Sequence, residues 1–591
     1  MYLKCNRRFK DGKEHRYWSI MENRRCVGGR VVQRPVLYLG EINDSQREAW
    51  IRSIEVFDED HGAQKKLALF AADRELPEAA ADAVAVRLSE FVLARPRQWG
   101  ACWLFSQLWE QLRLREFWRE RLGRSREGTD WEQVLEVLTA YRLIAPGSEW
   151  GLHRHWYAHS AMGDLLGADD TLAAKDTLYR CLDQILEHKR ALFSHLTARW
   201  RDLFGVKFEV LLYDLTSTYF ESDPPESEED KRRFGYSRDK RSDCVQVVIA
   251  LIVTPEGFPL AYEVLPGNTS DKTTLRAFLQ KIEDQYGVAQ RIWIMDRGIP
   301  TEEVLAEMRE SSQPISYLVG TPKGRLSKLE AQLLALPWQA VRPGLEVKLL
   351  PQEKEVYIFA QSRDRTAKER AMRQRQMKAL WKRLKELQKM TLKSNELLMK
   401  LGEARGRWRL AWRLLEIDVP EVAARQKATF SFRLNRDKLR EARRREGRYL
   451  LRTNLCGSDP AQLWQLYIQL TQIEEAFKNL KGDLAVRPIF HQLEKRIEAH
   501  ILIAFLAYCL HVTLRHRLQV HAPGLTPRAV LEKFATITML DAQFPTTDDR
   551  WLLFARYTQP EKDHRLLLEK LGLQLPEQSP PRITSTRQIA P

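Results

Sequence analysis

The sequence predicts a multidomain α/β protein whose central domain is a mixed β-sheet with helices on both faces. Three observations lead to this fold class. The chain has 591 residues, which is too long for a single hydrophobic core. Its pattern changes from strand-like to helical near residue 61 and back to strand-like near residue 206. From there we expect three strands, a helix, a strand, a helix and a strand, an order typical of α/β domains.

Composition indicates a globular protein with a basic surface. Hydrophobic residues make up 44% of the chain and charged residues 29%, values that exclude a disordered or fibrous protein. There are 95 Lys and Arg residues against 79 Asp and Glu, a net charge of +16. This excess of positive charge suits a partner made of phosphates.

Signals for secretion or a membrane are missing from the sequence. The seven cysteines include no CxxC pair, so we expect neither a disulfide framework nor a zinc site, and a reducing cytoplasm fits best. The N-terminus lacks the apolar region of a signal peptide. The longest apolar run, residues 501–510, is too short to span a bilayer and is expected to be a buried core helix. We therefore expect a cytoplasmic protein with no membrane partner.

Six segments are expected along the chain. Residues 1–60 alternate short strand-like pieces with turns and predict a small β module. Residues 61–205 are predicted to be helical, and both a DNA-binding region and a helical bundle with a solvated basic face fit their pattern. The remaining segments are the first part of the central domain, a basic insertion, the second part of the domain, and a helical region with a disordered tail: residues 206–320, 321–455, 456–520 and 521–591.

The strands of the central domain place two acids at positions of interest. KFEVLLYDLTSTYF is a strand with Asp214 where its apolar stretch ends, and VQVVIALIV and FPLAYEVL follow as further strands. PGNTSDKTTLRAFLQKIEDQYG carries helix start signals, and RIWIMDRG is a strand with Asp296 at its C-terminal end. A helix beginning near Thr301 and the strand ISYLVG complete the order expected of a ribonuclease-H-like domain.

The insertion combines strands with a basic helical stretch. VKLLPQEKEVYIFAQS predicts a hairpin, and ATFSFRL and GRYLLRTNL predict strands. Between residues 361 and 415 there are seventeen Lys or Arg and five Asp or Glu, with Trp381, Trp408 and Trp412 interleaved. Such a charge run is usually a solvated face, but this density with tryptophans also fits a surface that binds the DNA backbone.

The stretch LWQLYIQLTQIEEAFKNLK is predicted to be one amphipathic helix. Its apolar residues, Leu470 included, recur at helical spacing and should form a stripe that packs on a core. Tyr467, Glu474 and Lys481 are seven residues apart, about two turns, so they line up beside this stripe. Glu475 points further toward solvent. Glu474 is therefore the expected functional carboxylate, although a plain amphipathic helix with a solvated polar edge has the same pattern.

Three acids placed on a strand, after a strand and on a helix suit a two-metal phosphoryl-transfer site. The set is Asp214, Asp296 and Glu474. Oxygen ligands favour Mg²⁺ or Mn²⁺, and the lack of a Cys or His cluster argues against zinc. Lys481 would contact a phosphate, and Tyr467 could hydrogen-bond the same backbone. A strand-end Asp taken alone is more often a turn former or a cap.

Five ordered motifs carry a family resemblance: YDLTSTYFE, GYSRDKRSDCVQVVIALIV, LPGNTSDKTTL, WIMDRG and YIQLTQIEEAFKNLKGDLAVRPIFHQLEKRIEAHILIAFLAYCL. Together they resemble the DDE transposases of bacterial insertion sequences, in the class with a Tyr-x2-Arg-x3-Glu-x6-Lys signature. The resemblance covers roughly residues 207–515, with the insertion between the second Asp and the Glu. Tyr467, Glu474 and Lys481 match the signature, whereas Leu470 stands where the signature has Arg, which puts the phosphate contact of that Arg in doubt.

The resemblance implies cut-and-paste transposition of an insertion sequence by a homodimer. The enzyme would bind terminal inverted repeats, with end recognition by residues 61–205, cleave the element ends and join their 3′-hydroxyls to target DNA. Two Mg²⁺ or Mn²⁺ ions would be held by Asp214, Asp296 and Glu474. The resemblance and the basic loops suggest five DNA contacts: Tyr467, Lys481, Arg297, Lys240 and Arg241. Such an enzyme would act in the bacterial cytoplasm, on the nucleoid when bound to DNA.

Two alternatives to an active transposase are open at this point. One is a DNA-binding descendant of a transposase that no longer moves DNA, which the intact set of three acids disfavours. The other is a ribonuclease-H-like nuclease, which the basic insertion and the long flanking regions disfavour.

Overall fold

The computed structural model describes most of the chain. The described residues are 2–585 without 11–12, 26–30, 42–53, 59–62, 72–82, 127, 228, 240, 288–289, 297–298, 312–313, 322–328, 330–331, 334, 421–428, 457–458 and 488. They divide into two compact units, and each is described by itself: one contains Met1–Leu192 with Asn479–Pro591, and the other contains Phe193–Lys478.

The second unit is built on a mixed sheet. Its first five strands are β8 (Val210–Phe220), β9 (Val245–Val253), β10 (Pro259–Pro266), β11 (Ile292–Met295) and β12 (Ser316–Gly320), and they lie in the order β10-β9-β8-β11-β12. The pairs β8–β9 and β9–β10 are antiparallel, whereas β11 runs parallel to both β8 and β12. This is the ribonuclease-H-like order, so the predicted fold class is confirmed.

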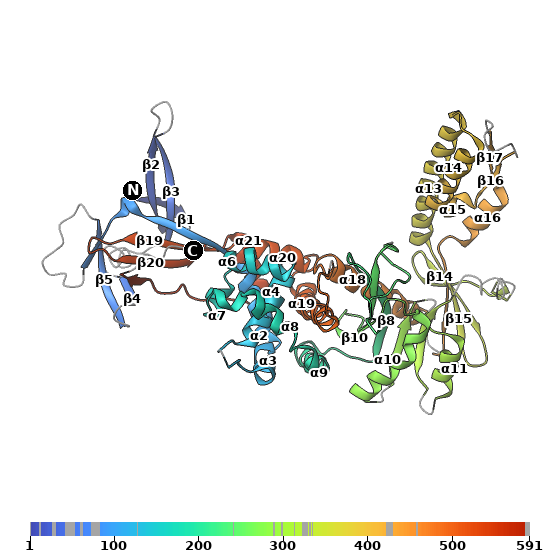
Figure 1. Cartoon of the computed structure of the whole chain (residues 1–591), viewed down its shortest axis with the longest axis horizontal. Coiled ribbons are helices and arrows are strands. Elements are labelled where there is room, and N and C mark those ends of the chain that lie inside the picture. The colour runs from blue at the N-terminus through green and yellow to red at the C-terminus, as the bar shows by residue number, and fades with distance from the viewer. Residues whose placement is uncertain are drawn as a thin grey trace. The chain divides into compact units, whose positions relative to one another are not determined.

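One face of this sheet is covered by two helices, α10 (Asp271–Tyr286) and α11 (Glu302–Glu310) (Figure 1). Thr301 starts α11 as predicted, because its side chain accepts a hydrogen bond from the N–H of Val304. The core between helices and strands includes Tyr213 and Leu215 of β8 and Met295 of β11. Alternate residues of a strand point to opposite faces, so Asp214 lies on the face away from α10 and α11.

The predicted insertion contributes strands to the same sheet. The expected hairpin is formed by β14 (Leu345–Pro351) and β15 (Val356–Ser362), and β13 (Gln339–Arg342) and β18 (Arg448–Thr453) flank it. β18 pairs with β12 and with β15, which extends the sheet to nine strands. The edge of β12 would otherwise present unpaired backbone groups, so its pairing with β18 closes an exposed edge.

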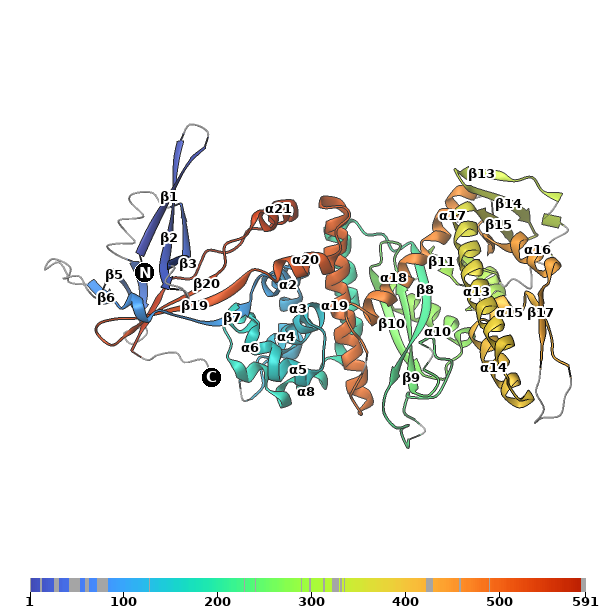
Figure 2. The same cartoon turned by 90° about the horizontal axis from the view of Figure 1, so that it is seen from above.

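The rest of the insertion has its own small core. Its elements are α13 (Arg363–Lys389), α14 (Ser394–Arg407), α15 (Arg409–Trp412), β16 (Leu415–Asp418), β17 (Ser431–Leu434) and α16 (Arg436–Arg445). Figure 2 shows α13 and α14 beside the β16–β17 pair. Leu380, Leu384 and Leu387 of α13 pack with Leu397 and Leu401 of α14. The three tryptophans of the basic stretch pack against this core, so they are at least partly structural.

The prediction of one continuous helix from residue 463 to 481 is wrong, because the structure has two helices there. These are α17 (Pro460–Ile468) and α18 (Leu470–Lys481), which meet at Gln469. The N–H of Gln469 bonds to the carbonyl of Leu466, three residues back instead of four, which tightens the chain there. The expected line from Tyr467 to Glu474 therefore crosses a break. Leu470 also differs from expectation, because it is half-buried and does not enter the core.

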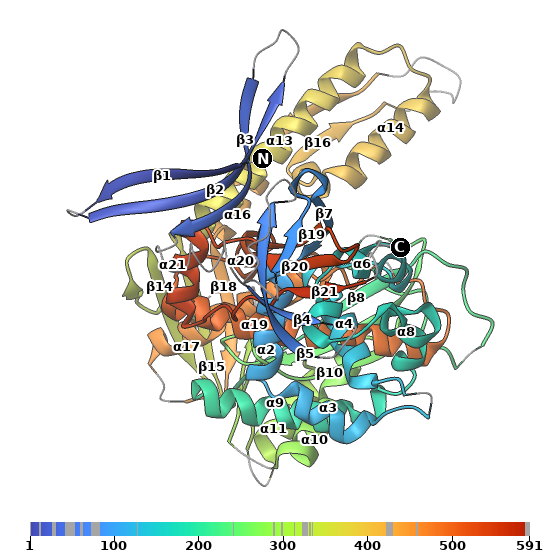
Figure 3. The same cartoon turned by 90° about the vertical axis from the view of Figure 1, so that its left-hand side faces the viewer.

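The first unit contains two sheets. β1 (Tyr2–Lys10), β2 (Lys13–Arg25) and β3 (Val31–Glu41) form an antiparallel sheet at the N-terminus (Figure 3). A seven-stranded sheet follows in the order β6-β5-β4-β21-β20-β19-β7. Its strands are β4 (Ile54–Asp58), β5 (Ala63–Ala71), β6 (Ala83–Val86), β7 (Val92–Gln98), β19 (Thr538–Pro545), β20 (Trp551–Tyr557) and β21 (Arg582–Thr584).

This second sheet corrects two expectations. The segments 61–205 and 521–591 were predicted to be helical, yet both contribute strands. The tail was expected to be disordered, but the structure describes the chain up to residue 585, and β21 lies within this tail. The strands form because distant segments pair, as when Ala542 of β19 pairs with Leu93 of β7. A buried ion pair fixes the same pairing, since Arg97 lies 2.8 Å from Asp541.

The helices of the first unit surround one long apolar helix. This is α19 (Glu494–His521), and it packs against α2 (Gly100–Gln111), α4 (Trp131–Ile144), α8 (Lys175–Leu182), α20 (Pro527–Phe534) and α21 (Lys562–Leu571). Two further helices, α3 (Leu114–Leu122) and α5 (Glu149–Gly151), pack against α4 and α8, respectively. By length and mean hydropathy, 1.8 over its most apolar window, α19 alone among the described helices could cross a membrane. However, 94% of that window is buried inside the protein, as expected of a core helix.

Candidate catalytic site and nucleic-acid interface

The three acids singled out in the sequence lie in one cavity of the second unit. The cavity has a volume of about 1490 Å³, and its lining includes Asp214, Asp296 and Glu474. These residues come from β8, from the position after β11, and from α18. Tyr467 of α17 also lines the cavity.

The strand register explains why Asp214 and Asp296 share this cavity. Met295 of β11 is aligned with Tyr213 of β8 in a parallel pair, so the acid that follows each residue lies at the same level of the sheet. Met295 and Tyr213 both enter the core under α10. The next residue on each chain must therefore point to the other face, which is where both acids are found.

Glu474 approaches the same face from α18. Its neighbour Ile473 is buried and holds the helix in place, while Glu474 itself is exposed and lines the cavity. Glu475 is also exposed but is not among the lining residues. The helix phase predicted for these two acids thus agrees with their positions.

The sequence predicted Tyr467 near Glu474, but not the aromatic group that surrounds it. Tyr449 of β18 stacks edge-on against Trp464 and Tyr467 of α17, with ring centroids 5.3 and 5.9 Å away. The guanidinium of Arg365 lies 3.9 Å from the centre of the Tyr449 ring. Burial raises the pKa of Tyr449, and the charge of Glu474 adds to this rise. These residues come from three distant segments, so no local sequence signal could have joined them.

Basic side chains from the insertion line the same cavity, which suits a phosphate-bearing substrate. They are Arg342, Arg365, Lys368, Arg373, Arg413, Lys438 and Arg445. Some are already partly balanced by acids, since Arg365 lies 2.8 Å from Glu369 and Arg373 also pairs with Glu446. The cavity therefore combines three carboxylates on the sheet side with a mixed, mainly basic wall.

Leu470 lines this cavity, although its spacing in the sequence predicted a place in the core stripe. An Arg at this position, as in the signature that the sequence resembles, would thus stand in the cavity wall, and here an apolar side chain takes its place.

None of the other predicted DNA contacts lines the cavity in the part of the chain that the structure describes. Lys481 is the last residue of α18 and is not among the residues that line the cavity. Arg241 forms ion pairs with Glu221 at 2.7 Å and Asp243 at 3.0 Å, and these hydrogen bonds raise the pKa of its guanidinium further. Arg297 and Lys240 lie outside the described residues.

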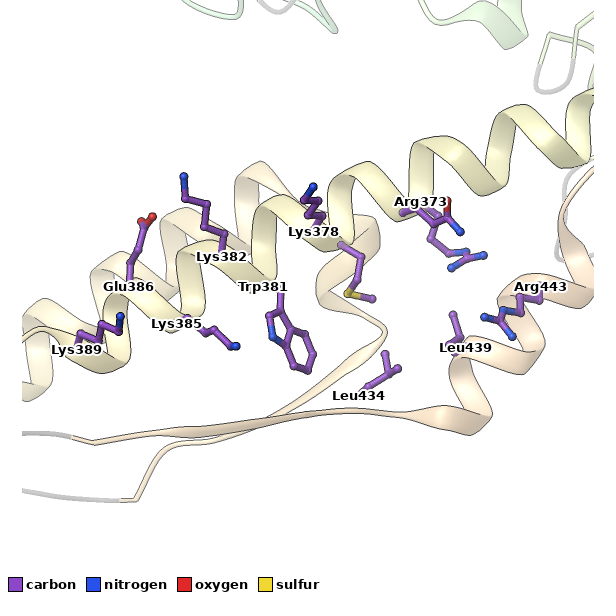
Figure 4. A pocket seen from close by; sticks show the side chains of 12 residues that line it. Arg373, Lys378, Trp381, Lys382, Lys385, Glu386, Lys389, Leu434, Leu439 and Arg443 are labelled. Carbon is purple, nitrogen blue, oxygen red and sulfur yellow. The ribbon is translucent and has the colours of Figure 1, made fainter.

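A second basic groove lies on the insertion, between α13 and α16 (Figure 4). Its volume is about 870 Å³, and it is lined by cations with a single acid, Glu386: Arg373, Lys378, Lys382, Lys385, Lys389 and Arg443. Trp381 and Leu439 provide apolar surface between them. Lys378, Lys382 and Lys385 are spaced by four and three residues, so they share one face of α13.

The strand order defines a ribonuclease-H-like domain, and the family model that matches this domain makes the protein an enzyme of DNA cleavage and strand transfer. The chain belongs to the family of the transposase DDE domain, whose model matches residues 207–510, just over half of the chain. The N-terminal domain model of the IS1634 family of transposases matches residues 3–56. The predicted DDE insertion-sequence transposase is therefore confirmed.

Two further comparisons add little detail. A search of curated proteins finds no match. Among solved structures, the chain is similar to the cryo-EM structure of a piggyBac transposase synaptic complex with hairpin DNA, with 9% identity and a TM-score of 0.35. That similarity covers 76% of this chain and 82% of the other.

Proposed function

We propose that this transposase moves an insertion sequence by cut-and-paste transposition, with phosphoryl transfer in the cavity of Asp214, Asp296 and Glu474. One observation carries the proposal: two strands aligned in register and a facing helix direct these three acids into one cavity. The cavity, about 1490 Å³ in volume, exceeds the usual size of a small-ligand pocket, which supports a larger substrate.

The donor set fits a pair of divalent ions. Asp214, Asp296 and Glu474 offer only carboxylate oxygens, which favour Mg²⁺ or Mn²⁺ over softer metals. When bound, such ions would activate an attacking hydroxyl and stabilise the leaving oxygen of the phosphodiester. The role of the protein is to hold the three carboxylates together on one face of the sheet, because the register of β8 and β11 fixes two of them.

Double-stranded DNA is the proposed substrate, with terminal inverted repeats at the element ends and a separate target duplex. The basic wall of the cavity and the groove on α13 would contact phosphates. Such contacts would position the DNA on the protein without reading its sequence. Tyr467 would contact the backbone near the scissile phosphate, and Lys481, Arg241, Arg297 and Lys240 remain proposed contacts. Assembly as a homodimer on two ends, and action on DNA in the bacterial cytoplasm, belong to the same proposal.

The test uses the full chain and a linear DNA that carries the inverted repeat flanking its gene. With Mg²⁺ we expect cleavage at the repeat boundary and joining of the freed 3′-hydroxyl to a target plasmid, and with EDTA we expect neither. DNA binding without cleavage would favour a non-transposing descendant. Cleavage without a joined product would favour a nuclease.

A further inference from the structure

Three polar side chains from distant segments converge inside the first unit. They are Glu149 of α5, His491 in the segment before α19, and His500 of α19. Their exposed fractions are 6%, 7% and 3%, so water has almost no access to them. One ligand-type atom from each residue lies within 4.8 Å of the other two.

The distances fit ligands that share one small ion. Nε2 of His491 and Nδ1 of His500 each lie 3.2 Å from the same oxygen, Oε1 of Glu149. Two ligands at about 2.1 Å from a tetrahedral ion lie about 3.4 Å apart, close to the spacing seen here. Nε2 of His491 is buried and faces Oε1 of Glu149 without the alignment of a regular hydrogen bond, whereas Nδ1 of His500 lies within hydrogen-bond distance of it. Two nitrogens that converge on one buried carboxylate oxygen need a proton or a metal cation between them, because a bare lone pair facing the carboxylate is costly.

The surroundings hold the three residues in place. Ser148 caps the short helix of Glu149 by accepting a hydrogen bond from the N–H of Gly151 at 3.1 Å. The ring of Tyr179 packs edge-on against His491, with centroids 5.7 Å apart.

Arg142 is a charged neighbour that argues for another arrangement. Its guanidinium lies 4.0 Å from Oε1 of Glu149 and 3.4 Å from Nδ1 of His500, and it donates a hydrogen bond to the carbonyl of Ala485. In a metal-free network, Glu149 would pair with Arg142 and His500, and Nε2 of His491 would have to carry a proton to pair with the same oxygen. With an ion present, Arg142 instead lies next to the carboxylate ligand and fixes its position.

We infer that Glu149, His491 and His500 form a structural site for one divalent transition metal, with Zn²⁺ the best match. Two imidazoles and one carboxylate are a ligand set that zinc accepts, whereas Mg²⁺ prefers oxygen alone. This site is chemically different from the three carboxylates of the catalytic cavity. It would tie α5 to the start of α19, and so join segments that are far apart in the sequence.

The experiment measures zinc in the full chain with Asp214→Asn, Asp296→Asn and Glu474→Gln as background, so that the catalytic acids cannot supply the signal. After dialysis in metal-free buffer, we expect about one zinc per chain by elemental analysis. His491→Ala should lower zinc affinity at least about a hundredfold, since a direct ligand matters more than a second-sphere partner. His511→Gln, which changes another buried histidine of α19, should keep the zinc.

A second variant guards against loss of folding. His491→Cys offers a thiolate, so it should bind Co²⁺ and add a sulfur-to-cobalt absorption band that the parent lacks. Zinc should also raise the unfolding temperature of the parent and of His491→Cys, but not that of His491→Ala. The inference is overturned if the folded background protein binds no zinc, or if His491→Ala and His511→Gln bind it equally. Such a result would leave a metal-free network of Arg142, Glu149 and the two histidines.

Discussion

Two groups of side chains that suit metal ions lie in opposite environments in this chain. Asp214, Asp296 and Glu474 line a wide cavity, where Asp296 and Glu474 are exposed and basic side chains stand nearby. Glu149 is enclosed with His491 and His500 in a dry interior. Open carboxylates can receive a large charged substrate with its ions, whereas enclosed ligands can only hold structure. Environment and ligand type together therefore separate the proposed catalytic site from the proposed structural metal site.

The largest effect is expected from a change to one of the three carboxylates in the cavity. Asp214→Asn should lower end cleavage at least about a thousandfold, equal to about 4 kcal/mol, because a metal ligand contributes several kcal/mol to the transition state. Binding to end DNA should persist, since the carboxylate repels phosphate. Single-turnover cleavage with a parallel mobility-shift assay measures both, and retained cleavage would remove Asp214 from the site.

The basic groove on α13 provides the next prediction. Replacing Lys378, Lys382 and Lys385 with Gln should weaken DNA binding and lower the salt slope by about 0.9 for each phosphate that is no longer neutralised. Lys400, Arg405 and Arg407 of α14 form the matched control, because the same charge is removed away from the groove. If both triple variants show the same slope, the groove has no special part in DNA binding.

Another buried histidine of the first unit, His511, should make the stability of the protein sensitive to acid. Burial, followed by the charge of Arg515, lowers the pKa of His511 to about 4. Between about pH 6.5 and 4, His511 is protonated in the unfolded chain but neutral in the folded chain. The free energy of unfolding therefore decreases as the pH decreases, by up to about 1.4 kcal/mol per pH unit. His511→Gln should flatten the pH dependence of the unfolding temperature in this range. His521→Gln, at the exposed end of the same helix, should leave it unchanged.

The smallest effect concerns the cavity wall. Leu470→Arg restores the signature residue beside Glu474 and should tighten binding to end DNA about tenfold, equal to about 1.4 kcal/mol. The salt slope should become steeper by about 0.9 if the new side chain meets a phosphate. Unchanged affinity and slope would show that this enzyme does not place DNA against that position.

The placement of the three acids could be predicted from the sequence because its signals are local. Asp214 lies within β8, Asp296 directly follows β11, and Glu474 lies beside a clear helical stripe, so residue pattern selected three acids that line one cavity. The break at Gln469 was missed because the apolar spacing continues through it, and this error moved Leu470 from the cavity wall into the core.

Features made by distant segments could not be predicted in the same way. The pairing of β7 with β19 turns short apolar pieces into strands only when the two meet. His491 and His500 carry no recognised metal spacing, and Glu149 lies far away in the sequence. The packing of Arg365 on Tyr449 likewise joins a helix of the insertion to a strand of the main sheet.

The most direct test of the central claim compares two adjacent acids of α18. Glu474→Gln should lower Mg²⁺-dependent end cleavage at least about a thousandfold with DNA binding intact, because Glu474 lines the cavity with Asp214 and Asp296. Glu475→Gln changes the same charge one position away and should cut at a nearly normal rate. Equal loss in the two variants would contradict the assignment of Glu474 as the third carboxylate of the site.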